Sequence, residues 1–212
     1  MTIRKLSGYG TSVTPPGNLR VLHSDLDIAN AYLSGEANTA CTVVQGGIAQ
    51  SLGITSDYLR HSNREHMTHV LIDLLQVDFT TSKQHSKQHA NQLSIVVAGS
   101  LVIEKRTPLT THHIISNSGI LRGRDVLPRS HPNDGLVDVL EISPSITPRQ
   151  RLVAWHRAKT GSHLPHPLLR ATSNTQFEWS GKPSRMVADG VTFTGVDWVR
   201  CSVLADAIGL YF

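Results

Sequence analysis

The sequence predicts an α+β fold, in which an α/β segment is followed by a β-rich domain. Two observations carry this prediction. Apolar residues recur every three or four positions in two early segments, which is the helical period. Beyond the first 91 residues, the chain breaks into many short runs that alternate in polarity or are rich in β-branched residues. The predicted units are therefore residues 1–91 and residues 92–212.

The first unit is predicted to hold two helices and one strand. Leu19–Leu33 carries the helical period, and Gly35 follows it as a stop signal. Cys41–Val44 is a short apolar run typical of a strand, and His61–Leu75 is predicted as the second helix. Residues 83–91 are polar and lack apolar periodicity, which favours a linker between the two units.

The second unit is predicted to contain a series of strands and one helix. The helix covers Pro148–Lys159, with Thr147 as its N-cap and Pro148 at its first position. The predicted strands are residues 93–97, 100–105, 113–116, 137–142, 175–179, 185–188, 199–203 and 207–211.

Composition narrows the class of protein. Hydrophobic residues make up 39% of the 212 residues and charged residues 17%, which is globular composition and excludes disorder. A net charge of +4 favours phosphates or an anionic membrane surface without establishing either. Cys41 and Cys201 fit free, buried thiols in a reducing cytoplasm. No apolar run approaches the ~18 residues that span a membrane, so we expect a cytoplasmic protein whose membrane contact, if any, is peripheral.

Two Asp-Gly pairs lie in the second unit, at Asp134-Gly135 and Asp189-Gly190. The local sequence alone favours a plain turn at each of them. The alternative for Asp134 is a hard-cation site, because one carboxylate and backbone carbonyls across a tight turn suit Mg²⁺ or Ca²⁺. The alternative for Asp189 is a general base that accepts a proton from a substrate hydroxyl.

Both turns belong to an ordered series of motifs. The series is ISNSG at 115–119, GRDVLP at 123–128, NDGLVDV at 133–139, TGSH at 160–163, ADG at 188–190 and the closing VLADAIGLY at 203–211. In this order it resembles the second domain of the bacterial diacylglycerol kinase family, which includes related lipid kinases and sphingosine-kinase-like proteins. The resemblance covers Leu93–Phe212.

The resemblance implies a β-rich, sandwich-like second domain packed on an α/β nucleotide-binding domain, of which residues 1–91 would be an incomplete α/β segment, a partial remnant. It implies a structural Mg²⁺ held by the Asp134 side chain and by the carbonyls of His131 and Leu136. It also implies that Asp189 acts as, or supports, the general base. The family places a Glu two residues after this Asp, where this chain has Val191.

The family holds ATP phosphates through the backbone N–H groups of a G-G-D-G-T loop and has a P-x-G-T-x-N element after it. The matching positions here are Gly10 and Thr11 within SGYGT, and Gly17 and Asn18 within PPGN. A Tyr replaces the family's Asp in the first element. The resemblance implies ATP binding at these four residues, in a nucleotide domain that begins part-way.

By resemblance, the chain is a lipid kinase of the diacylglycerol kinase type, which transfers phosphate from Mg-ATP to a lipid hydroxyl. Its departures from the family predict a truncated or degenerate member. One alternative is a non-catalytic lipid- or partner-binding module. Another is a fragment whose nucleotide-binding half is supplied by a second chain. The expected partners are a lipid or membrane surface and, as in family members, a second copy of the chain; nucleic acid is not expected.

Histidines and basic residues leave two further alternatives. His66 and His69, or His85 and His89, would place two imidazoles on one helical face as a transition-metal site, but solvated surface histidines are the favoured interpretation. The basic segment Arg149–Lys159 fits either a membrane or phosphate contact or a solvated helix face, and the second is favoured.

Overall fold

A computed structural model describes residues 10–14, 16–36, 39–54, 66–82, 91–105 and 110–212. Its helical segments are α1 (Asp25–Leu33), α2 (Gly47–Ser51), α4 (Pro148–Arg157) and the short 3-10 helix η3 (Ala158–Thr160). Its strands are β1 (Thr11–Val13), β2 (Arg20–Leu22), β3 (Cys41–Val43), β4 (Met67–Thr81), β5 (Asn91–Val97), β6 (Ser100–Glu104), β7 (Thr111–Ser116), β8 (Ile120–Leu121), β9 (Arg124–Asp125), β10 (Val137–Ile142), β11 (Leu169–Asn174), β12 (Gln176–Ala188) and β13 (Val191–Tyr211).

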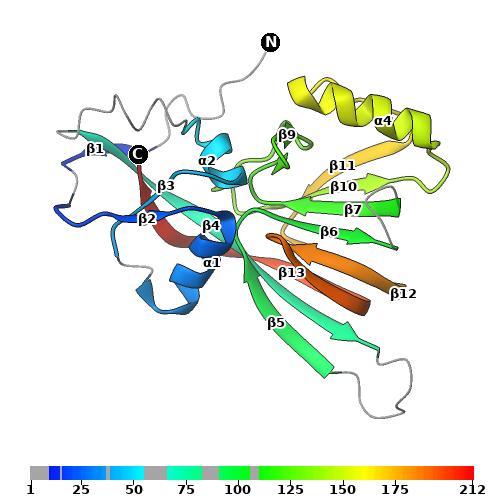
Figure 1. The fold of residues 1–212 in the computed structure, drawn as a ribbon, viewed down its shortest axis with the longest axis horizontal. Helices are drawn as coiled ribbons and strands as arrows, with labels where there is room; N and C mark the ends of the chain where they lie inside the picture. Colours follow the sequence, from blue (N-terminus) through cyan, green and yellow to red (C-terminus); the bar gives the residue numbers. More distant parts are fainter. Residues whose placement is uncertain (1–9, 15, 37–38, 55–65, 83–90, 106–109) are drawn as a thin grey trace.

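One large sheet organises the part of the chain that the structure describes (Figure 1). Its strands follow the order β1-β4-β13-β12-β6-β7-β10-β11, and all pairings along this path are antiparallel. Strand β5 pairs with β4, while β3 pairs in parallel with both β2 and β13. In Figure 1, α4 lies along β10 and β11, whereas α1 and α2 lie beside β2, β3 and β4.

Alternation along β6 and β7 gives the sheet two apolar faces, because successive side chains of a strand point to opposite sides. We call the first face the inner core. It includes Leu101 and Ile115 together with Phe79, Val139 and Met186 from neighbouring strands. The second, which we call the outer core, lies between the sheet and α4. It contains Val102, Ile114, Val126, Leu127, Leu140, Ile146, Ala158 and Leu169.

A third cluster, the N-terminal core, joins α1 and α2 to the sheet. It packs Ile28 and Ile48 of the helices against Cys41, Val70 and Leu210 of β3, β4 and β13. The two ends of the chain's longest strands therefore serve different cores. The first residues of β4 and the last of β13 support the helices, and the remainder of both strands lines the inner core.

Most of the predicted strands are confirmed, and the large antiparallel sheet with a few helices is consistent with the predicted α+β class. Strand β10 has the predicted limits, and α4 begins at the predicted Pro148. The Thr147 hydroxyl accepts a hydrogen bond from the Gln150 amide, and the Gln150 side-chain oxygen accepts one from the Thr147 amide, which forms a capping box. The description of residues 1–91 as a remnant of a nucleotide-binding domain stays a prediction.

The predicted helix over His61–Leu75 is wrong. Residues 67–81 form the long strand β4, which hydrogen-bonds to β1, β5 and β13, while residues 61–65 lie outside the described part of the chain. The apolar spacing of residues 67–81 fits the period of a helix or of a strand, and hydrogen bonding to the neighbouring strands selects the strand.

Several boundaries also differ from the prediction. The strands predicted at 175–179 and 185–188 are one strand, β12. Residues 20–22 form β2, and α1 begins only at Asp25 because the Ser24 hydroxyl caps it by accepting from the Asp27 amide at 3.1 Å. The strands predicted at 199–203 and 207–211 are one strand, β13. Its register against β4 shifts between Leu204 and Ile208, where Asp206 adopts a left-handed φ of 50°.

The predicted linker at residues 83–91 falls mostly outside the described residues. The strands on either side of it, β4 and β5, pair with each other in the same sheet. The division into units 1–91 and 92–212 stays a prediction.

Candidate functional site

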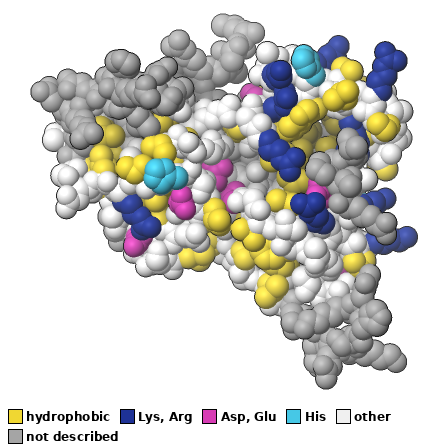
Figure 2. Space-filling view, in the orientation of Figure 1, with side chains coloured by type: hydrophobic (Ala, Val, Ile, Leu, Met, Phe, Trp, Pro, Cys, Tyr) yellow, Lys and Arg dark blue, Asp and Glu magenta, His cyan; other side chains and the backbone are white. Residues whose placement is uncertain are grey.

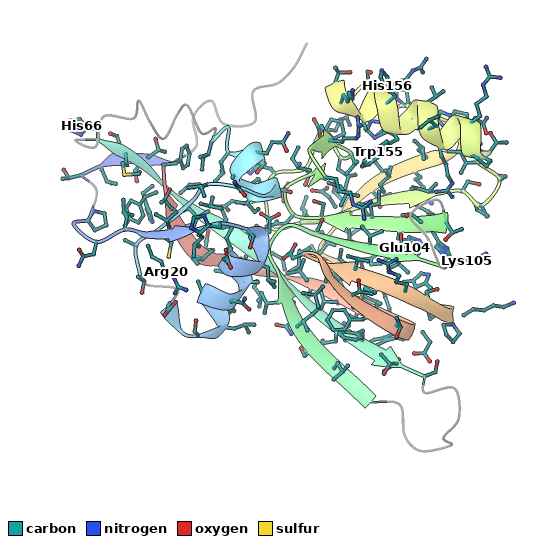
Figure 3. The ribbon with its side chains drawn as sticks, in the orientation of Figure 1. Arg20, His66, Glu104, Lys105, Trp155 and His156 are labelled. Atoms are coloured by element: carbon teal, nitrogen blue, oxygen red, sulfur yellow. The ribbon has the colours of Figure 1, made fainter. Side chains whose placement is uncertain are left out.

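A cavity of about 250 Å³ lies between α4 and the outer face of the sheet. Its walls are mainly apolar and include Val102, Ile114, Leu140, Trp155 and Leu169. No residue of α4 is buried, so the helix covers the sheet without filling the space beneath it. In Figure 3, Trp155 projects from α4 toward the sheet, whereas the exposed His156 projects to the opposite side.

A small polar group forms part of the cavity wall (Figure 3). Glu104, at the end of β6, is only 1% exposed. Its carboxylate accepts a hydrogen bond from the Thr111 hydroxyl at 3.3 Å and lies 3.2 Å from the Arg185 guanidinium. Arg151 of α4 donates to the Thr111 carbonyl at 2.8 Å. The charge of Glu104 is therefore compensated by Arg185, and Arg151 fastens the helix to the start of β7.

His163 lines another part of the same cavity. Its ring is buried, and Nε2 lies 3.0 Å from the Val126 carbonyl, which suits a neutral imidazole with the proton on Nε2. Burial lowers the pKa of His163, which favours that neutral form. The contact fixes the His163 ring against the Val126 carbonyl.

The Asp189 turn connects β12 to β13. Asp189 has a left-handed φ of 43°, and Gly190 follows at 87°, as a tight hairpin requires. The Asp189 carboxylate accepts hydrogen bonds from three backbone amides, those of Ala98 at 2.7 Å, Gly99 at 3.0 Å and Ser100 at 2.9 Å. The carboxylate thus locks the β12–β13 turn onto the β5–β6 turn.

A second carboxylate, that of Asp25 at the start of α1, faces the same point. It accepts hydrogen bonds from the amides of Gly47 at 2.7 Å and Ile48 at 3.0 Å. A Cβ placed on Gly99 would overlap Asp25 Oδ2 and lie 3.0 Å from Asp189 Oδ1. Gly99 therefore has no side chain for a steric reason, because two acidic side chains converge on its Cα.

Burial raises the pKa of Asp189 to about 6, and the nearby charge of Asp25 acts in the same direction against the three backbone hydrogen bonds. Burial also raises the pKa of Asp25. A carboxylate has about four lone-pair positions, and the three amides occupy most of those of Asp189. The pKa of Asp189 thus lies near neutrality, and its role as a general base stays a prediction.

The Asp134 turn is tied to two other parts of the sheet through Asp73 of β4, a buried residue. The Asp73 carboxylate accepts from the Gly135 amide at 2.8 Å and from the Asp206 amide at 2.9 Å. The Asp134 carboxylate accepts from the Leu136 amide at 3.0 Å. Burial, with smaller contributions from the charges of Asp138 and Asp73, raises the pKa of Asp134 to about 6.

This donor set fits a hard cation. The three predicted ligands, Asp134 and the carbonyls of His131 and Leu136, lie within one short loop. The buried Oδ2 of Asp138 has no hydrogen-bond partner within the described residues, and a divalent ion would offset the repulsion that raises the Asp134 pKa. Among the same residues, no group of three or more His, Cys, Asp or Glu side chains is placed to hold a metal. Mg²⁺ at Asp134 stays a prediction.

The four predicted ATP-binding residues lie apart from Asp189. Gly10 has a φ of 90° and packs on β4, where a Cβ would lie 2.8 Å from the His69 carbonyl, and Thr11 pairs with His69 at the edge of the sheet. Along β4, His69 is six residues from Leu75, which corresponds to roughly 20 Å. Leu75 pairs with Val97, which directly precedes the residues whose amides bind Asp189. Gly17 and Asn18 are exposed residues before β2.

The alternative of a metal site made by two histidines on one helical face is not supported at His66 and His69, because His69 lies on a strand. His69 lies on β4 and His66 directly before it, and residues three apart on a strand point to opposite faces. His85 and His89 lie outside the described residues. Cys41 and Cys201 are both free and buried, as expected.

Sequence reasoning missed Asp25, Asp73 and Glu104. Asp73 holds the Asp134 turn from 62 residues away, and Asp25 lies against Gly99 beside Asp189, which is 164 residues further along the chain. No local pattern in the sequence indicates such a pairing. A weak signal existed for Glu104, because it is an acid at the end of an otherwise apolar strand and therefore needs a partner if buried.

Comparisons with known proteins support the fold. No family model and no curated protein matches the sequence. Solved structures do match. A proposed diacylglycerol kinase of Bacillus anthracis str. Sterne aligns with a TM-score of 0.50 and 8% identity over 91% of this chain and 77% of that chain. Another structure of a proposed diacylglycerol kinase of that organism aligns at 0.49 with 10% identity, over 91% and 76%. At such identities the first match shows a shared fold, and the chain resembles this kinase class in that sense.

None of the helices in the described part of the chain has the length and apolar content to cross a membrane.

Proposed function

We propose that this protein binds a single hydrocarbon chain of a lipid in the cavity beneath α4. The observation that carries the proposal is the cavity itself, which is walled by branched aliphatic side chains and the Trp155 ring and covered by a helix with no buried residue. An apolar cavity with a few fixed polar groups is the usual form of a small-ligand site. The fold shared with a proposed lipid kinase supports the same class of ligand.

The size of the cavity favours one chain over two. Its volume of about 250 Å³ is below the ~300–1,000 Å³ of pockets that enclose drug-sized ligands. A fatty acid or another single-chain amphiphile is therefore a better fit than both chains of a diacyl lipid.

The test is to fill the cavity. Ile114→Trp replaces a wall residue with a larger apolar side chain and should weaken binding of a fluorescent single-chain fatty acid, added as monomer without vesicles, at least about tenfold. Val191→Trp makes a comparable change on the exposed β12–β13 hairpin and should bind as the native chain does. Circular dichroism checks that both variants fold. Native affinity in the Ile114→Trp variant would overturn the proposal.

Phosphoryl transfer to a lipid hydroxyl is a second candidate, favoured by Asp189. Its pKa of about 6 and the approach of Asp25 are suited to accepting a hydroxyl proton, which is a step that such a transfer requires. Lipid binding alone predicts no transfer of radiolabel from ATP to monoacylglycerol or diacylglycerol. Label that appears with the native chain and disappears with Asp189→Asn would establish the kinase instead.

A further inference from the structure

The segment that carries α4 has an unusual charge pattern. Residues 142–177 contain no Asp or Glu, yet they contain five Arg or Lys residues, namely Arg149, Arg151, Arg157, Lys159 and Arg170. In the rest of the chain, acidic and basic residues are nearly balanced, because this stretch supplies more than the whole net charge of +4. One surface of the protein is therefore locally cationic.

The outward stripe of α4 combines this charge with exposed apolar side chains. Leu152 and Val153 are 68% and 45% exposed, and they stand next to each other. Arg149, His156 and Arg157 are also exposed and fall at the spacing i, i+3, i+4, i+7, i+8 with them, which places all five on one side of the helix. We call this set the outer face of α4. Two apolar residues lie at its centre, with cations at both ends.

Within the described part of the molecule, no carboxylate forms an ion pair with this face, and Arg149, Val153 and Arg157 border a hollow that they share with His163 and His166. The ion pairs in the described part of the molecule join Arg20 to Glu36 and Arg185 to Glu104, so neither Arg149 nor Arg157 takes part in one. Figure 2 shows Lys and Arg side chains gathered around hydrophobic ones over the region that α4 occupies in Figure 1. Exposed leucine and valine ringed by unpaired cations match the chemistry of an anionic bilayer surface.

We propose that the outer face of α4 docks on an anionic lipid bilayer. Leu152 and Val153 enter the boundary between head groups and acyl chains, and Arg149 and Arg157 contact lipid phosphates. The inference rests on the proposed function and deepens it. The helix that meets the membrane is the one that covers the cavity, with Leu152 touching both, so a lipid chain has a short path from bilayer to cavity.

The test is co-sedimentation of the full chain with vesicles. Native protein should pellet with vesicles of phosphatidylglycerol and phosphatidylcholine and stay in solution with phosphatidylcholine alone. The double charge reversal Arg149→Glu with Arg157→Glu should reduce binding to anionic vesicles at least about tenfold. Lys182→Glu with Arg200→Glu makes the same change of net charge on exposed residues of β12 and β13 and should bind like the native chain. Val153→Asp, which removes only apolar contact, should weaken binding as well.

The outcomes separate this inference from the cavity proposal. Monomeric fatty acid, measured without vesicles, should bind the charge-reversed variant as it binds the native chain. Vesicle binding that survives Arg149→Glu with Arg157→Glu, or that falls equally in the Lys182 and Arg200 control, would overturn docking through α4 whatever the cavity binds. Native protein that pellets with anionic vesicles but takes up no fatty acid would leave the docking face standing and remove the cavity proposal. A native dimer dispersed by Val153→Asp would assign the face to a second copy and overturn bilayer docking.

Discussion

The two faces of the same sheet differ in how completely they are covered. Ile115 and Ile114 are neighbours on β7, yet Ile115 belongs to the inner core and Ile114 to the outer core with its cavity. On the inner side, β4, β12 and β13 surround the apolar residues, so that Phe79, Met186 and Val199 are fully buried. On the outer side, within the part of the chain that the structure describes, α4, η3 and the β8–β9 ribbon cover the strands together with connecting residues such as Val126, Leu127 and Ile146.

This difference in coverage explains why space for a ligand is found on the outer face of the sheet. A sheet that packs on other strands interlocks side chains to near-crystalline density and leaves little free space. A single amphipathic helix with exposed Leu152 and Val153 contributes fewer side chains to the layer below it, and Arg151 ties it to the edge of the sheet through the Thr111 carbonyl. The outer layer is therefore held by polar contacts at its edges and stays open in its centre.

The largest expected effect is the difference in the free energy of unfolding between alanine variants of Ile115 and Ile114. Ile115→Ala removes a fully buried side chain from a filled core and should lower the free energy of unfolding by about 4 kcal/mol. Ile114→Ala enlarges a space that already exists and should lower it by about 2 kcal/mol, because fewer packing contacts are lost. Urea denaturation monitored by circular dichroism measures both.

Because Ile114→Ala and Ile115→Ala are the same chemical change, a difference between their losses of stability reports on packing alone. Both variants remove the same atoms from adjacent residues of one strand, so propensity and strand pairing cancel. Equal losses of stability would show that the outer layer is as well filled as the inner core and would contradict the comparison.

Much of this layering was predictable from the sequence, because alternation in β7 and β10 is local. The run Val137–Ile142 predicts its strand with the observed limits. The run at Met67–Thr81 does not, because its apolar spacing fits a helix as well as a strand, and only its pairing with β13 and β5 selects the strand. Long strands were predicted in pieces for a similar reason. β13 contains the polar Asp206, where the strand continues through a shift in register rather than ending in a turn.

The candidate sites were predictable only as far as they are local. Both Asp-Gly turns follow from two adjacent residues, and both carry left-handed backbone where turn chemistry requires it, at Gly135 and at Asp189. What each carboxylate faces is a tertiary property. Asp25 meets Asp189 only because α1 and the β5–β6 turn converge at Gly99, and the cavity exists only because α4 returns over β7 and β10. No spacing in the sequence encodes either distance.

The smallest expected effect concerns acid sensitivity, which should differ between the two layers. Burial lowers the pKa of His163 in the outer layer, so below the ordinary pKa of ~6.5 the unfolded chain binds a proton that the folded state resists. The stability that the neutral ring contributes is thus present at pH 7 and is lost as the pH falls through about 6.5.

Hydrogen-exchange protection of the α4 and η3 amides, corrected for intrinsic rates, should drop by up to about tenfold per pH unit between 6.5 and 5.5. Protection in β7 and β10 should change less, because opening of the helix layer leaves the inner core intact. His163→Gln keeps a neutral donor for the Val126 carbonyl and should flatten the pH dependence in α4. If native α4 amides keep the same protection at both pH values, His163 does not fasten the outer layer, and the acid response of the two faces is the same.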